Sequence, residues 1–214
     1  MIVVKLGGSV IKKWAEIVEA LLEAGGEVGE KILIVPGGGE IADRIRAMNV
    51  DDERAHWMAI SAMEINSHIL LSLSSKLEEI SAKNFEEIDF EGAGVLLPYC
   101  FMRSNDELPH SWDVTSDSIA LWVAGKLGAE VVIKVTDVDG ILRDGMLVEK
   151  IDADELTFES CLDLYSPYLM KKYGIDVFVC NGLYPQRVKD YILRERAIGT
   201  FVTCAEKKRK TGGR

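Results

Sequence analysis

The sequence has no long hydrophobic run. Its 214 residues contain no apolar stretch that approaches the about 18 residues typical of a membrane-spanning helix. The first residues, Met1 to Leu6, lack the basic start and the small-residue cleavage site of a secretory signal peptide and instead predict a strand. We therefore expect a cytoplasmic protein without a membrane partner.

Cysteine and histidine are also scarce. The four cysteines are scattered, with no Cys-x-x-Cys pair and no histidine nearby at the spacing of zinc ligands. We expect them to be free and mostly buried. The three histidines are His56, His68 and His110. No metal-ligand pattern surrounds them, so we predict no protein metal site and a structural role for His56 and His110.

Positive charge is in deficit over most of the chain. The net charge is −10, yet residues 207–214 contribute five positive charges and no acid, which leaves 20 of the 25 basic residues against 35 acidic ones. Such an acidic body repels nucleic acid, so we expect no nucleic-acid partner. We expect the basic tail, residues 207–214, to be solvated and disordered.

Apolar runs alternate with amphipathic segments, which is typical of an α/β sheet. The pattern predicts strands at residues 2–6, 31–35, 95–97, 130–135, 176–180 and 200–203, with a hairpin at 141–150. It predicts helices at residues 11–24, 40–48, 52–74, 118–127, 154–165 and 167–173, and a last one begun by Pro185. Residues 99–110 read as irregular. Without repeats or low-complexity linkers, residues 1–206 are expected to form a single domain.

Two glycine clusters follow predicted strands and precede predicted helices. The first is Lys5-Leu6-Gly7-Gly8-Ser9, and the second is Gly37-Gly38-Gly39 after Pro36. Glycine lets the backbone approach a phosphate closely, and a helix start offers unpaired N–H groups to an anion. Each cluster alone is also compatible with a tight turn, but two in the same geometry favour a pair of anion-binding loops.

Two further motifs carry carboxylates and hydroxyls. Thr115-Ser116-Asp117 begins a predicted helix, where all three residue types are good N-caps, and Asp117 is alternatively a carboxylate that orients phosphate-binding lysines. Thr136-Asp137-Val138-Asp139-Gly140 follows a predicted strand and suits a ribose, a magnesium shell or a turn.

The ordered set of these motifs, closed by Gly199-Thr200, resembles the amino acid kinase family over about residues 1–204. This resemblance implies a three-layer α/β/α sandwich around a largely parallel central sheet. It also implies a kinase that uses ATP and Mg²⁺, with an acceptor-binding lobe at about residues 1–114 and a nucleotide-binding lobe at about 115–206. Homo-oligomers are common in the family.

Within the family, residues 110–118 and 179–188 are similar to small archaeal kinases that act on [5-(aminomethyl)furan-3-yl]methyl phosphate in methanofuran biosynthesis. The implied reaction transfers the γ-phosphoryl group of ATP to this phosphate monoester and gives a diphosphate. Residues after the glycine triplet depart from the patterns of uridylate and isopentenyl phosphate kinases, which remain alternatives. A non-catalytic nucleotide- or anion-binding protein of the same fold is another.

The resemblance also implies roles for single residues. The catalytic set is Lys5, Asp117 and a second lysine, Lys171, with Lys172 as its alternative. The nucleotide-binding set is Gly7, Gly8, Ser9, Thr136, Asp137, Asp139 and Gly140. The acceptor-binding set is Gly37, Gly38 and Gly39, to which we add Arg46, Trp112 and Thr115 as candidates from their side-chain chemistry and position.

Individual acceptor contacts stay open in the sequence. Arg46 can grip a phosphate bidentately or stand as a solvated helix arginine, and Trp112 can stack on a ring or pack in the core. The candidates for an ammonium partner are the acids Asp106, Glu107 and Asp113.

Overall fold

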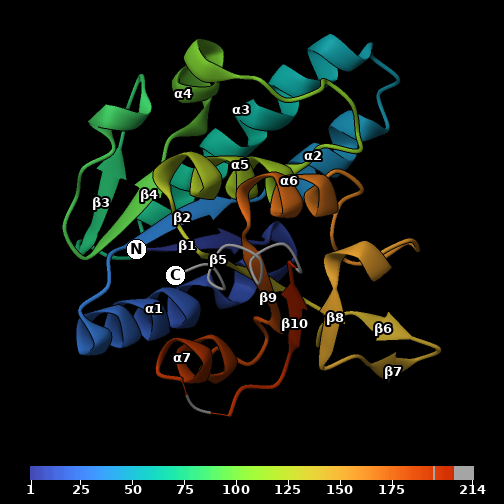
Figure 1. Cartoon of the computed structure of the whole chain (residues 1–214). Coiled ribbons are helices and arrows are strands. Elements are labelled where there is room, and N and C mark those ends of the chain that lie inside the picture. The colour runs from blue at the N-terminus through green and yellow to red at the C-terminus, as the bar shows by residue number, and fades with distance from the viewer. Residues whose placement is uncertain (195, 205–214) are drawn as a thin grey trace, which may run out of the picture.

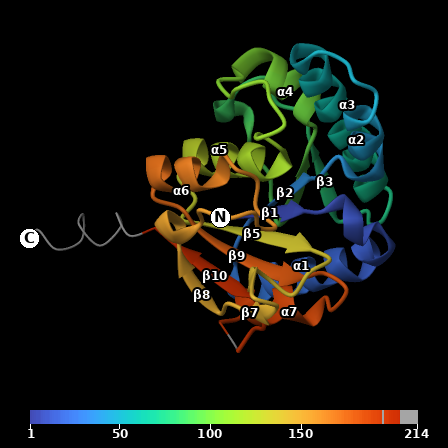
Figure 2. The same ribbon diagram turned by 90° about the vertical axis from the view of Figure 1, so that its right-hand side faces the viewer.

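An eight-stranded sheet lies between two layers of helices (Figure 1). The computed structural model describes residues 1–194 and 196–204, and the predicted basic tail lies outside this part of the chain. Helices α2 to α6 cover one face of the sheet, and α1 and α7 cover the other (Figures 1 and 2). The predicted three-layer α/β/α architecture is confirmed.

The sheet is almost entirely parallel. Its strand order is β3-β4-β2-β1-β5-β9-β10-β8, and among these neighbours only β9 and β10 pair antiparallel. The strands are β1 (Ile2–Leu6), β2 (Ile32–Pro36), β3 (Leu77–Ile80), β4 (Ala93–Leu96), β5 (Val131–Thr136), β8 (Lys150–Asp152), β9 (Asp176–Asn181) and β10 (Thr200–Thr203). A separate hairpin joins β6 (Leu142–Arg143) and β7 (Met146–Leu147).

The helices connect these strands across the two faces. They are α1 (Trp14–Val28), α2 (Gly39–Arg46), α3 (Asp52–Leu71), α4 (Pro98–Asn105), α5 (Ser116–Leu127), α6 (Ser166–Tyr173) and α7 (Gln186–Ile192). Short 3₁₀ helices occur at Gly8–Lys13, Phe85–Glu87 and Ala153–Glu155. Among the described residues, no helix combines the length and the apolar character needed to cross a membrane.

Several local predictions differ from the structure. The predicted helix at 154–165 is wrong, because the segment forms one 3₁₀ turn and then an irregular loop. The stretch read as irregular contains α4, which Pro98 can begin because a first-turn residue needs no N–H partner. Strand β3 was missed, since its two central glutamates break any apolar alternation.

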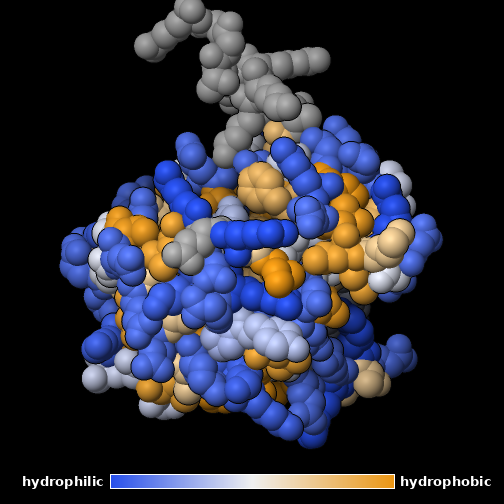
Figure 3. Space-filling view, turned by 90° about the horizontal axis from the view of Figure 1, so that it is seen from below, coloured by the Kyte–Doolittle hydropathy of each residue, from blue (hydrophilic) through white to orange (hydrophobic). Residues whose placement is uncertain are grey.

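Strand alternation divides the core into two layers. On β1, Val3 packs into the core that contains Val123 of α5, whereas Val4 and Leu6 pack into the core that contains Trp14 of α1. The outer surface of the α1 and α7 layer is mostly hydrophilic, with separate hydrophobic spots (Figure 3). The side chains of the candidate site stand on the other face of the sheet, which α2 to α6 cover.

The two glycine loops pack directly against each other. A Cβ added at Gly8 would lie 2.3 Å from the Cα of Gly39, and one added at Gly37 would lie 3.3 Å from the Gly8 nitrogen. Gly39 has a φ of +55°, which favours glycine. The Nδ2 of Asn66 donates to the Gly37 carbonyl at 2.6 Å and fixes the second loop.

We predict that Gly8→Ala lowers the free energy of unfolding by about 1–3 kcal/mol, as overpacking of a tight contact does. The measurement is equilibrium urea unfolding. Gly26→Ala is the matched control, because an added Cβ there meets no atom within 4 Å and alanine stabilises a helix interior by about 0.5–1 kcal/mol. Equal stability of both variants would contradict the close packing of the two loops.

Candidate active site

Two buried lysines stand side by side on the sheet. Strands β1 and β5 are parallel neighbours, and Lys5 is the register partner of Lys134. Both side chains share the strand face covered by α5, and both residues are buried, with 9% and 5% of their surface exposed. Because two adjacent ammonium groups repel each other strongly away from water, this pair requires a counter-charge.

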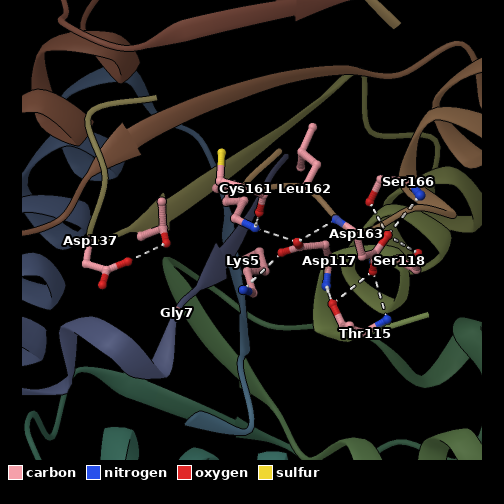
Figure 4. A network of polar contacts seen from close by, with 12 residues as sticks. Lys5, Gly7, Thr115, Asp117, Ser118, Asp137, Cys161, Leu162, Asp163 and Ser166 are labelled. Atoms are coloured by element: carbon pink, nitrogen blue, oxygen red, sulfur yellow. Dashed lines mark hydrogen bonds and ion pairs between the residues drawn. The ribbon is translucent and has the colours of Figure 1, made fainter. Parts of the chain in front are cut away.

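Asp117 supplies that charge from the first turn of α5 (Figure 4). Its Oδ2 lies 2.5 Å from the Lys134 Nζ, and its Oδ1 lies 2.9 Å from the Lys5 Nζ. The Lys5 contact is an ion pair to a carboxylate oxygen that is fully buried. Thr115 caps the helix by accepting the Asp117 N–H at 3.3 Å, and the helix N-terminus favours the carboxylate.

The protonation states follow from this arrangement. Burial by itself would raise the pKa of Asp117, but the charges of Lys134 and then Lys5 outweigh it and lower the pKa to about 2. For Lys5, burial is the largest influence and lowers the pKa of the ammonium, although Asp117 opposes the shift. With both lysines protonated, the three groups carry one net positive charge, so they favour an anion beside them.

Asp163 ties the adjoining loop to this cluster. Its carboxylate accepts six hydrogen bonds of 2.6 to 3.0 Å, from the backbone N–H and the hydroxyl of each of Thr115, Ser118 and Ser166. Its own N–H donates to Asp117 Oδ2 at 3.3 Å (Figure 4). Lys134 also donates to the carbonyl of Cys161 in the same loop. Residues 161–166 are thus held against the start of α5.

A cavity of about 820 Å³ opens beside the lysine pair. The walls come from the second glycine loop, α2, α3, the start of α5 and the loop at residues 156–164. Six residues predicted from the sequence line it: Lys5, Gly38, Arg46, Trp112, Thr115 and Asp117. The Arg46 guanidinium lies over the Trp112 ring, 4.4 Å from its centroid. The structure therefore brings the two principal acceptor candidates together.

The residues predicted to bind nucleotide gather on the other side of Lys5. Figure 4 shows Asp137 across Lys5 and Gly7 from Asp117, and the Gly7 N–H donates to the carbonyl of Val135 at 2.8 Å. Thr136 donates to Asp137 at 3.2 Å. A Cβ added at Gly140 would lie 2.4 Å from the Thr200 hydroxyl oxygen.

Asp139 is held by two residues that the sequence prediction did not include. Its Oδ1 accepts from Asn181 at 2.9 Å and from Arg187 at 2.6 Å. These hydrogen bonds, first that of Asn181 and then that of Arg187, lower the pKa of Asp139. Asn181 ends β9, which is the register neighbour of β5 at Thr136. In the sequence, Asn181 could have been identified as a site residue because an Asn-Gly pair directly follows a predicted strand.

The second catalytic lysine predicted from the sequence does not reach Asp117. Lys171 is partly exposed on α6 and forms an ion pair with Asp154 at 2.8 Å, while the ammonium of neighbouring Lys172 lies 5.2 Å from the Tyr173 ring centroid. Lys134 takes the place beside Asp117 instead. The signal missed in the sequence is a lysine inside an otherwise apolar strand, where a charge is costly unless it is paired.

The three acids considered as partners for an acceptor ammonium do not line the cavity. Asp106 is bound by His56 at 2.7 Å, and Glu107 pairs with Lys126 at 2.7 Å. Asp113 is exposed and is not among the cavity-lining residues that the structure describes. The acids at the α2 and α3 wall are instead Asp43 and Asp52.

Comparisons with known proteins identify the family of the chain. Residues 1–162 match the amino acid kinase family, and the chain belongs to that family. It is 32% identical to [5-(aminomethyl)furan-3-yl]methyl phosphate kinase of Methanocaldococcus jannaschii, over 97% of this chain and all of the relative. It is 25% identical to the uridylate kinase of Methanocorpusculum labreanum, over 94% of each chain.

The solved structures it resembles share the fold. Uridylate kinase from Archaeoglobus fulgidus has a TM-score of 0.72 at 20% identity, over 94% of this chain and 99% of that one. UMP kinase from Bacillus anthracis has a TM-score of 0.73 at 17% identity, over 94% and 95%. The chain belongs to a kinase family and is similar over its full length to a phosphate kinase, so it is a phosphotransferase.

Proposed function

We propose that this kinase transfers the γ-phosphoryl group of ATP to [5-(aminomethyl)furan-3-yl]methyl phosphate, giving the diphosphate used in methanofuran biosynthesis. An oxygen of the acceptor phosphate attacks the γ-phosphorus, the bond from that phosphorus to the bridging oxygen breaks, and ADP leaves. The main support is the buried cation pair at the cavity wall together with the full-length similarity to a kinase of that acceptor.

The cation pair suits a reaction between two anions. Phosphoryl transfer needs positioning and charge neutralisation more than covalent help from the protein. Lys5 and Lys134 face the cavity from adjacent strands, with Asp117 fixing both ammonium groups. A phosphate monoester loses its second proton at about pH 6 and therefore offers an ionised oxygen at neutral pH without a general base.

The donor fits the glycine-lined side of Lys5. Gly7 and Gly8 leave no room for a Cβ, and Ser9 is exposed beside them, so we propose this loop, with residues 136–140, for ATP. Magnesium that arrives with ATP supplies further positive charge to the phosphates. Glycine in both loops allows the backbone N–H groups to approach the two phosphate chains.

The acceptor fits the opposite side of the cavity. Arg46 has a planar guanidinium for phosphate oxygens, and Trp112 offers an aromatic face for a flat ring. Gly37 to Gly39 and Thr115 complete the acceptor end. We propose Asp43 and Asp52 as the partners of the acceptor ammonium, in place of the three acids considered from the sequence. We also propose that the enzyme acts in the cytoplasm as a homo-oligomer.

An acceptor screen tests the proposed substrate directly. The purified chain with Mg²⁺ and ATP is incubated with the aminomethylfuran phosphate, UMP or isopentenyl phosphate, and ADP release is followed by a coupled assay. We expect kcat/KM for the furan phosphate to exceed that for each alternative by at least about 100-fold, since unmatched polar groups in a site strongly reject analogues. A higher value for UMP would instead assign the uridylate kinase reaction.

The second lysine gives a prediction that separates Lys134 from Lys171. We expect Lys134→Met to lower kcat by at least about 100-fold, because it removes one preorganised cation from the transferred phosphoryl group. Lys171→Met, the matched control on α6, should retain kcat within about threefold, as surface ion pairs contribute little. Near-wild-type turnover by a folded Lys134→Met enzyme would remove Lys134 from the mechanism.

A further inference from the structure

A second cluster of titratable side chains lies at the other end of the cavity wall. His56 comes from α3, Asp106 follows the last turn of α4, and His110 lies in the loop that leads to α5. The Nε2 atoms of both histidines point to the same atom, Asp106 Oδ2, at 2.7 and 3.1 Å. One ligand-type atom from each residue thus lies within 4.8 Å of the other two.

Packing holds these side chains in place before any ligand binds. The two imidazole rings stack with their centroids 3.8 Å apart and their planes at 13°. The Trp57 ring meets both edge-on, at 5.0 and 5.5 Å. The side chains of His56 and Asp106 are only 4% and 7% exposed. A convergent, buried set of this kind is costly unless its polar atoms are satisfied.

His110 faces a carboxylate through each of its ring nitrogens. The other ring nitrogen of His110, Nδ1, contacts Glu53 Oε2, so both of its nitrogens face carboxylates, which only accept when ionised. With a metal on Nε2, a single proton on Nδ1 satisfies Glu53, which is the usual arrangement of a metal-bound histidine and its carboxylate partner.

We propose that His56, Asp106 and His110 bind a divalent transition-metal ion of the zinc class. Two imidazole nitrogens and one carboxylate oxygen suit such an ion, whereas Mg²⁺ prefers oxygen ligands alone. Neighbouring ligand atoms around tetrahedral zinc are about 3.4 Å apart. Metal binding therefore requires the imidazole rings to tilt and their Nε2 atoms to move slightly farther from Asp106 Oδ2 than the 2.7 and 3.1 Å seen here. Because His56 also lines the cavity, the ion would sit in the wall of the acceptor end.

Metal binding by the full-length chain tests this site. Protein that has been treated with chelator and kept reduced is titrated with Zn²⁺ by calorimetry. We expect one saturable site per chain, and at least about 100-fold weaker binding for His56→Ala and for Asp106→Asn, because each removes a ligand. His68→Ala is the matched control, since His68 is exposed on the same helix α3, and it should bind as the wild type does.

A second measurement keeps the test decisive if a variant does not fold. The absorption spectrum of the Co²⁺-loaded wild type distinguishes nitrogen and oxygen ligands from thiolate, which adds an intense charge-transfer band. A thiolate band would place the metal on a cysteine such as exposed Cys100 and overturn the proposal. So would the absence of saturable Zn²⁺ binding, or unchanged binding in folded His56→Ala.

Discussion

The site depends on one carboxylate between two buried ammonium groups. Asp117 contacts Lys5 and Lys134 with opposite oxygens, and it supplies the counter-charge that two buried, adjacent ammonium groups need. When both lysines are protonated, the two ammonium groups and the one carboxylate together carry a net charge of +1. In the proposed function, that surplus in a buried wall is what lets an acidic chain with a net charge of −10 accept phosphates.

The fold produces this cluster by simple geometric rules. Parallel pairing of β1 with β5 puts the two lysines in register, and alternation along each strand turns both toward α5. The N-terminus of α5 lies over these two strands, and this position brings Asp117 in its first turn between the two lysines. Asp163 fixes that N-terminus by accepting bonds from Thr115, Ser118 and Ser166, so the loop that walls the cavity also positions the carboxylate.

Much of the fold could be predicted from the sequence because its signals are local. Apolar strands followed by glycine and a helix indicated the α/β class and the positions of both glycine loops, and the motif around Asp117 indicated the central carboxylate. The second lysine could not be chosen in this way. Lys134 stands out in the sequence only as a charge inside an apolar strand, and the register of β1 with β5 is what places it beside Lys5.

Long-range contacts account for the other differences. Asp163 lies in a segment that looked helical, yet its side chain is used to cap α5 instead. His56 and Asp106 are 50 residues apart in sequence and meet only because α4 packs on α3. No spacing rule anticipates such a meeting, so the histidines were predicted to be structural. Their convergence on one carboxylate oxygen appears only in three dimensions.

The most direct test of the central interaction is the pH dependence of kcat for Asp117→Asn. The carboxylate raises the pKa of Lys5 against the effect of burial. Removing its charge should lower that pKa further, so the ammonium is lost at a lower pH. The account predicts a reduced kcat with its alkaline limb moved to lower pH than in the wild type. A folded variant with unchanged kcat and an unmoved alkaline limb would contradict it.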